Sequence, residues 1–248
     1  KEVARRRETV PLSELRRAGP THDGGRRFMA AIERPGLSVI AEHKRRSPSA
    51  GPIRDDVSVE EVVGAYERGG AAALSVLTDE RHFGGSLEDL RRARAACALP
   101  ILRKDFIVDA YQVHESVAAG ADAILLIVAA LDDAELATLH ALAVELGLAA
   151  LVEAHDELEL ERAAAVAAPL IGINNRDLRT MDVDPDRGLR LLGRVPDGVA
   201  TVVESGLRDR AQLDQAAAAG ADAVLMGESL MRAPDIEAAC RAVTGEAG

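Results

Sequence analysis

Charged and amide side chains end several of the short apolar segments of this sequence, at positions where apolar residues would pack better. Lysine and glutamate can serve as general acids and bases, and charges held close together shift each other's pKa in ways that suit proton transfer. If these side chains meet in the folded chain, they indicate acid and base catalysis. The residues are Glu42, Lys44, Lys104, Glu153, Asn174 and Glu204.

These side chains can meet only if the segments that carry them end at one edge of a sheet. Short apolar runs bounded by turn residues alternate with segments of helical periodicity, and parallel neighbouring strands need such a crossover each time. The pattern predicts an α/β protein with a single (β/α)8 TIM barrel. A doubly wound open sheet is the alternative, but the sequence has no GxGxxG turn after the first run. The predicted strands are residues 38–42, 72–77, 100–104, 121–127, 148–153, 169–174, 200–205 and 221–226.

One phrase of the sequence is repeated. AAGADAILLI, at residues 118–127, returns as AAGADAVLMG at 218–227, and GGAAALSVL at 69–77 is a looser copy. Each phrase fits a helix that ends at its glycine, a short turn and a buried strand. The chain therefore repeats a helix-to-strand unit.

Side-chain alternation predicts where the polar groups point. Residues two apart on a strand share a face, so Glu42 lies on the face of Ile40, and Lys104 on that of Leu102. The other polar residues that end a predicted strand likewise share a face with residues that are largely apolar. If those apolar residues fill the barrel, the polar groups crowd its carboxyl end, where barrel enzymes carry their active sites.

Glycine- and serine-containing loops indicate a phosphate site at the same end. ESG (204–206) and MGES (226–229) follow the seventh and eighth predicted strands, the usual place in barrels for backbone N–H groups that bind phosphate. SPSAG (47–51) is a loop directly after the first strand. Phe83 and Phe106, two of only three phenylalanines, lie beside the same mouth and suit an aromatic substrate.

Length and composition fit one domain. We expect residues 1–36 to form an N-terminal helical extension, with helices at 12–18 and 26–33 that cap the barrel, and residues 37–248 to form the barrel. The formal net charge of −11 argues against nucleic-acid and membrane partners. No apolar run is long enough to span a membrane, and the first ten residues do not resemble a signal peptide, so we expect a soluble, untargeted protein.

The cysteines and histidines carry no metal-ligand spacing, so we expect no metal site. Cys97 and Cys240 read as ordinary small residues of a reducing compartment, which favours a cytoplasmic location. His43 should point away from Glu42 and Lys44 and pack against a helix. The DLRTMDVDPD segment, rich in carboxylates, lacks the spacing of a calcium loop and is expected to be a solvated loop.

Several of these strings together resemble the indole-3-glycerol-phosphate synthase family of tryptophan biosynthesis. IAEHKRRSPSAG, SVLTDERHFGGS, PILRKDFIVDAYQ, LVEAHDELEL, IGINNRDLRT, VVESGL and GESLM match in order from about residue 36 to the end. The resemblance implies a carboxy-lyase that converts 1-(2-carboxyphenylamino)-1-deoxyribulose 5-phosphate to indole-3-glycerol phosphate, with loss of carbon dioxide and water. It implies no cofactor, and a monomer or weak homo-oligomer is expected.

The resemblance also implies residue roles. Lys104 resembles the general acid of ring closure, Glu153 the base of the dehydration, and Lys44 a second lysine that binds substrate and donates a proton. Glu42 and Asn174 resemble the residues that orient these groups. The implied substrate-binding positions are Ser47, Ser205, Gly206, Gly227 and Glu228 for the phosphate, Phe83, Phe106, Leu125 and Leu178 for the aromatic ring, and Arg176 and Glu204 as polar contacts.

Two departures from the family pattern stand out. His43 occupies a position where an apolar residue is expected, and the chain starts at Lys1 inside what resembles the family's amino-terminal helix. We therefore expect part of the segment that covers the substrate to be missing.

Three other functions share some of these features. A phosphosugar isomerase or aldolase would use the same phosphate loops, and an aldolase would form a Schiff base at Lys104. A flavin-binding oxidoreductase is a more distant alternative. A catalytically silent barrel that serves as a scaffold is the third. Buried charges argue against it, because they would lower the stability of a scaffold and would have no function there.

Overall fold

The computed structural model describes residues 2–18, 23–48, 51–177 and 180–245. Its centre is a closed barrel of eight parallel strands in which β1 pairs with both β4 and β10, so the predicted TIM barrel is confirmed. Every predicted run became a strand. The barrel strands are β1 (Ser38–His43), β4 (Ala73–Leu77), β5 (Ile101–Lys104), β6 (Ala123–Ile127), β7 (Ala149–Ala154), β8 (Leu170–Asn174), β9 (Ala200–Glu204) and β10 (Ala223–Met226).

A two-stranded antiparallel hairpin follows β1 and was not predicted. Its strands are β2 (Arg46–Ser47) and β3 (Gly51–Pro52), where the sequence indicated only a Ser/Pro/Gly loop. Arg46 anchors the hairpin by donating to the carbonyl oxygens of Glu80 and Arg81. The hairpin could not be predicted from its own sequence, because these contacts are made with residues about 35 positions away.

Helices surround the barrel, and several begin at side-chain caps. Ser58 and Asp132 each form a capping box with the glutamate three residues later, which satisfies N–H groups that have no partner within the helix. The helices are α4 (Val59–Arg68), α5 (Glu80–Phe83), α6 (Leu87–Ala96), α7 (Ala110–Ala119), α8 (Asp133–Glu145), α9 (Glu157–Ala165), α10 (Asp186–Leu192), α11 (Arg210–Ala218), α12 (Glu228–Met231) and α13 (Ile236–Thr244), with a 3₁₀ turn η2 (Val128–Ala130).

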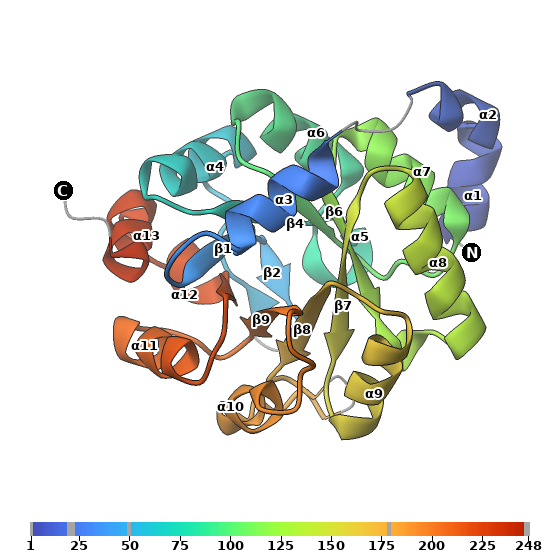
Figure 1. Ribbon diagram of the computed structural model, residues 1–248. Coiled ribbons are helices and arrows are strands. Elements are labelled where there is room, and N and C mark those ends of the chain that lie inside the picture. Colours follow the sequence, from blue (N-terminus) through green and yellow to red (C-terminus); the bar gives the residue numbers. More distant parts are fainter. Residues whose placement is uncertain (1, 19–22, 49–50, 178–179, 246–248) are drawn as a thin grey trace.

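The residues before β1 form helices, as expected. They are α1 (Glu2–Thr9), α2 (Leu12–Leu15), the 3₁₀ turn η1 (Arg16–Ala18) and α3 (Gly24–Ile32). Helix α3 lies across the end of the barrel where the strands begin, and its Phe28 and Ile32 are fully buried against the barrel interior (Figure 1). Helices α1 and α2 pack instead on α7, at the side of the barrel.

The repeated sequence phrase corresponds to a repeated hydrogen-bond pattern. Gly120 and Gly220 both adopt positive φ, +87° and +96°, one directly after α7 and the other two residues after the end of α11. Two residues later an aspartate reaches to the neighbouring strand: Asp122 accepts the Ile101 N–H at 2.8 Å, and Asp222 accepts the Thr201 N–H at 2.7 Å. Each unit therefore fixes the start of one strand to the start of the next.

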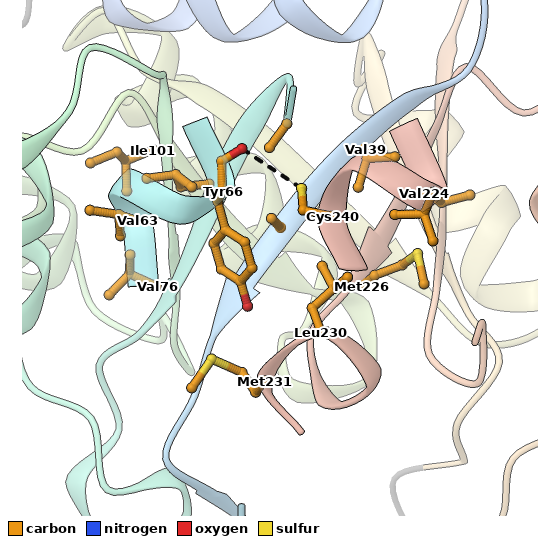
Figure 2. Close-up of a cluster of buried hydrophobic side chains, with 14 of the residues drawn as sticks. Val39, Val63, Tyr66, Val76, Ile101, Val224, Met226, Leu230, Met231 and Cys240 are labelled. Carbon is orange, nitrogen blue, oxygen red and sulfur yellow. Dashed lines mark hydrogen bonds between the residues drawn. The ribbon is translucent and has the colours of Figure 1, made fainter. Parts of the chain in front are cut away.

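Two apolar layers stabilise the barrel. One fills its interior, and the other lies between the strands and the helices, where Figure 2 shows side chains from β1, α4, β10 and α12 in contact around Tyr66. The Tyr66 hydroxyl donates to the Glu42 carbonyl oxygen at 3.0 Å, and the Cys240 thiol faces the Tyr66 carbonyl oxygen at 3.7 Å. The outer layer thereby holds the backbone at the end of β1.

In the described part of the chain, no helix combines the length and the apolar character that crossing a bilayer requires.

Candidate active site

A cavity of 770 Å³ opens at the carboxyl end of the barrel. Every predicted site residue that the structure describes lines it, whereas Leu178 lies outside the described residues. The lining includes Glu42, Lys44, Ser47, Phe83, Lys104, Phe106, Leu125, Glu153, Asn174, Arg176, Glu204, Ser205, Gly206, Gly227 and Glu228. Side-chain alternation along parallel strands thus brought together polar residues that are far apart in the sequence.

Lys104 lies at the centre of the polar group. Its Nζ is 2.8 Å from Glu153 Oε2 and 2.9 Å from Glu204 Oε2, and the three side chains are almost completely buried. Burial alone would lower the pKa of Lys104, but the carboxylates of Glu153, Glu204 and Glu42 raise it above its usual value. Lys104 is therefore an ammonium group at neutral pH.

The two glutamates that contact Lys104 differ in their electrostatic surroundings. Burial opposes ionisation of both, but Lys104 and His155 hold the pKa of Glu153 well below its usual range. For Glu204, burial and the adjacent Glu153 outweigh Lys104 and raise the pKa. An ionised carboxylate thus lies beside a carboxyl group that resists ionisation, a separation typical of acid and base sites.

A second lysine and carboxylate pair comes from β1 and the residue after it. Lys44 Nζ is 2.9 Å from Glu42 Oε1, with the side chains 16% and 6% exposed. Asn174, at the end of β8, accepts the Arg176 N–H through Oδ1 at 2.9 Å, which leaves its amide nitrogen for the cavity. These groups extend the polar floor beyond Lys104.

Lysine is rare in this chain. There are three lysines against 27 arginines, and two of the three, Lys44 and Lys104, line the cavity. A guanidinium group stays protonated in proteins, whereas the pKa of a lysine ammonium group shifts readily with its surroundings, so that it can give up its proton. The chain therefore uses lysine at the place where a cation able to lose its proton would be useful.

Two glycines leave room for the buried carboxylates. A Cβ atom at Gly172 would collide with Glu204 Oε1, and one at Gly227 would lie 2.6 Å from Glu42 Oε1. Both positions are on or next to barrel strands, where any larger residue would displace the carboxylate. The carboxylate positions thus depend on the absence of a side chain on the neighbouring strand.

The loops after β9 and β10 form one rim of the cavity. Ser205 and Gly206 adopt positive φ, +67° and +82°, and Gly227 precedes the short helix α12. The first N–H groups of a helix lack partners within it, so this rim offers donors to an anion. Ser229, missed by the sequence analysis, also lines the cavity, and its Oγ is buried without a hydrogen-bond partner among the described residues.

The opposite rim is apolar. Phe83, Phe106 and Leu125 line it as predicted, together with Leu77 and Ile127, which sequence reasoning did not single out. The loop that carries Phe106 is held by its neighbours: the Phe106 N–H donates to Asp105 Oδ1, and its carbonyl oxygen accepts from Gln112 Nε2, both at 2.8 Å. A flat ring can therefore lie between this wall and the charged floor.

His43 points away from the cavity, as predicted. It is 2% exposed. The charges that act on it belong to Arg45, Asp89, Glu42 and Arg92, and of these only Glu42 lines the cavity. Among the residues that the structure describes, no cluster of three or more histidine, cysteine, aspartate or glutamate side chains has the arrangement to hold a metal ion.

The sequence profile of the indole-3-glycerol phosphate synthase family matches residues 1–243. The chain belongs to the indole-3-glycerol phosphate synthase family. It is 53% identical to indole-3-glycerol phosphate synthase 2 of Streptomyces coelicolor over 92% of this chain and 88% of that protein. It is 50% identical to the synthase of a Nocardioides species over 98% of this chain and 94% of that one. Family membership makes the chain a carboxy-lyase of tryptophan biosynthesis with indole-3-glycerol phosphate synthase activity.

Solved structures with low sequence identity confirm the fold alone. Thiamine phosphate pyrophosphorylase from Pyrococcus furiosus aligns with a TM-score of 0.64 at 15% identity, over 84% of this chain and 94% of that one. Orotidine 5'-phosphate decarboxylase from Pyrococcus horikoshii aligns with a TM-score of 0.59 at 16% identity, over 76% of this chain and 94% of that one.

Proposed function

We propose that the substrate is 1-(2-carboxyphenylamino)-1-deoxyribulose 5-phosphate and that the charged floor of the cavity closes its indole ring by acid and base catalysis. The substrate has a phosphate at one end and a carboxylated aromatic ring at the other. The cavity offers matching rims, with N–H donors after β9 and β10 and an apolar wall around Phe106. The carbonyl carbon that must react then lies over the floor between them.

The observation that carries the proposal is the position of Lys104. Its ammonium group is 2.8 Å from a buried carboxylate and faces a cavity walled by apolar side chains. In the first step Lys104 donates a proton to the substrate carbonyl oxygen while the aromatic carbon that bears the carboxylate attacks the carbonyl carbon. A positioned acid of this kind contributes roughly 10² to 10⁴ in rate.

The later steps need a base and a second acid. Carbon dioxide leaves, and its bonding electrons neutralise the iminium formed in the first step. Glu153 then takes a proton from the ring carbon beside nitrogen, and the hydroxyl departs as water with a proton from Lys44. The lysines have given two protons and Glu153 has gained one, so each turnover takes one proton from solvent. Glu153 Oε2 can return its proton to Lys104 across 2.8 Å.

Glu42, Asn174 and Glu204 position these groups in the proposal. Glu42 contacts Lys44, and Glu204 contacts Lys104, so each lysine has a glutamate side chain that fixes its ammonium group. Asn174 and Arg176 belong to the loop after β8 and provide polar contacts to the substrate. Ser47, Ser205, Gly206, Gly227 and Glu228 are the proposed phosphate positions, and Phe83, Phe106, Leu125 and Leu178 the aromatic ones.

The charge of Lys104 argues against an aldolase. A Schiff base requires a neutral amine, and the carboxylates around Lys104 raise its pKa instead of lowering it. Borohydride should therefore trap no adduct between a phosphosugar and this lysine.

The assay follows indole fluorescence after the substrate is mixed with wild type, Lys104→Ala and Lys104→Arg. We expect both variants to lose about 10² to 10⁴ in kcat, because arginine keeps the charge but cannot release a proton. Arg91→Ala, on the exposed face of α6, is the control and should match wild type. Wild-type turnover in folded Lys104→Arg would contradict the proposed role of Lys104.

A further inference from the structure

His155 lies behind the proposed base and outside the substrate cavity. It follows β7 directly and shares its side-chain parity with Glu153, but sequence reasoning did not single it out. The two residues line different cavities: Glu153 lines the 770 Å³ cavity, and His155 lines a second cavity of 890 Å³, which is lined mainly by residues of η2, α9 and α10. His155 therefore reaches Glu153 from the side away from the substrate.

The imidazole of His155 is held between two carboxylates. Its Nε2 is 3.3 Å from Glu153 Oε1, and its Nδ1 is 2.9 Å from Glu159 Oε2. The backbone N–H of His155 donates to the same Glu159 oxygen at 2.8 Å. Glu159 in turn lies in the first turn of α9, where its N–H is capped by Asp156. The ring orientation is thus fixed through α9.

The two oxygens of Glu153 consequently have different partners. Oε2 faces Lys104 at 2.8 Å in the cavity, and Oε1 faces His155 at 3.3 Å behind it. Without a partner behind, the carboxylate could rotate and present both oxygens to Lys104. With Oε1 held behind by His155, Oε2 stays directed into the cavity, where it can take a proton from substrate carbon once Lys104 has given up its own.

We propose that His155, held by Glu159, is a positioning residue that fixes the orientation of the Glu153 carboxylate for proton abstraction. The proposal rests on the proposed role of Glu153 as the base. It assigns to a residue outside the substrate cavity an effect on turnover but none on substrate binding.

Charge acts in the same direction as geometry. Burial alone would lower the pKa of His155, but the contacts with Glu153 and Glu159 raise it to about 9. An imidazolium at neutral pH helps Lys104 to keep Glu153 ionised, against the effect of burial. The other charged residues around the second cavity are Asp156, Glu157, Arg162, Asp177, Arg187, Arg190 and Arg194.

Two amide variants separate the contacts of the ring. In His155→Gln the amide nitrogen takes the place of Nε2 and can still contact Glu153. In His155→Asn it takes the place of Nδ1 and can reach only Glu159. We expect kcat to fall in the order wild type, His155→Gln, His155→Asn, by about 10²-fold in the last, because small misplacements of reacting groups cost that much. KM should stay within about twofold of wild type, since the ring lines no part of the substrate cavity.

The pH profile distinguishes positioning from a structural role. Both variants remove a cation beside Glu153, so its pKa rises and the acid limb of the kcat profile moves to higher pH. Glu157→Gln is the matched control, because Glu157 lies in the same turn of α9 and pairs with Arg194 instead. It should leave kcat and the profile unchanged.

Three outcomes are decisive, with Glu153→Gln measured in parallel. An inactive Glu153→Gln together with folded His155 variants of wild-type kcat would overturn the positioning proposal alone. A fall in kcat with an unmoved acid limb, equal in the two His155 variants, would also overturn it. Full turnover in Glu153→Gln would refute the base assignment and, with it, the role of His155.

Discussion

At the scale of single residues, burial and partners decide the charge of a side chain. Lys104 and His43 are both buried, and in both cases burial favours the neutral form. Carboxylates around Lys104 reverse that effect and raise its pKa. For His43 the carboxylates of Asp89 and Glu42 compensate too little: burial and the nearby Arg45 lower its pKa to about 4, and its Nδ1 has no hydrogen-bond partner among the described residues. It is neutral at pH 7.

The neutral state of His43 predicts a pH-dependent stability. Its pKa is near 6.5 in the unfolded chain and about 4 in the folded one, so stability is full above pH 6.5 and is lost as pH falls toward 4. The loss is at most about 3 kcal/mol. We expect His43→Leu to lose less stability than wild type between pH 6.5 and 4.5. Urea denaturation at the two values measures this, and parallel losses in both proteins would contradict the buried neutral histidine.

Residue placement was predictable where it depends on strand parity alone. The alternation that placed Glu42, Lys104 and Glu153 at one end needs no knowledge of the partner strands. Pairings across strands do need it. His155 has the right parity, but its use depends on the position of Glu159 in the following helix, and the buried hydroxyl of Ser229 depends on how α12 begins. The role of Leu178 stays a prediction.

At the scale of elements, the repeated GAD phrase has a structural purpose at the amino ends of the strands. In the second copy Asp222 accepts hydrogen bonds from both the backbone N–H and the hydroxyl of Thr201. Thr201 is 4% exposed, so water could not easily replace the lost acceptor. This end of the barrel lies opposite the candidate active site.

We expect Asp222→Ala to cost about 1–3 kcal/mol in free energy of unfolding, because a buried N–H loses its acceptor. The kcat of the folded variant should equal that of wild type, since the aspartate lies at the amino end of β10. Asp214→Ala is the control: its exposed contact with Arg210 should be worth less than about 1 kcal/mol. Equal urea midpoints for the two variants would show that the repeated aspartate has no structural role.

Element types were predictable where the pattern is periodic and strongly apolar. All eight barrel strands and the longer amphipathic helices are of this kind. Helix α1 was indicated only by the family resemblance, because its sequence, EVARRRET, has no apolar stripe, and it is held by polar contacts with α7. The β2 and β3 hairpin was missed for a similar reason, since contacts from Arg46 to a distant loop hold it in place.

At the scale of the whole molecule, the N-terminal helices are attached to the barrel near the candidate active site. Arg6 Nε is 2.9 Å from Glu115 Oε1, and Arg7 is 2.6 Å from Asp109, both on or at the start of α7. The Tyr111 hydroxyl donates to the carbonyl oxygens of Arg6 and Val10. Helix α7 follows β5, which ends at Lys104, and the loop of Phe106, so the extension contacts an element that supports the site.

We propose that residues 1–36 and the barrel form one domain, and the two tyrosines of the chain offer a test. Tyr66 lies in the barrel core and Tyr111 at the contact with α1, so in Tyr66→Phe the remaining tyrosine emission reports on the extension. A single domain predicts that Tyr111 fluorescence and far-UV circular dichroism change at the same urea concentration.

A second set of variants tests the contact itself. Adding Arg6→Gln and Arg7→Gln to the Tyr66→Phe protein should lower that shared midpoint, because buried Glu115 loses a cation, whereas Arg5→Gln, on the same helix, should not. A Tyr111 transition that precedes the loss of helix in the Tyr66→Phe protein would show that the extension unfolds independently of the barrel.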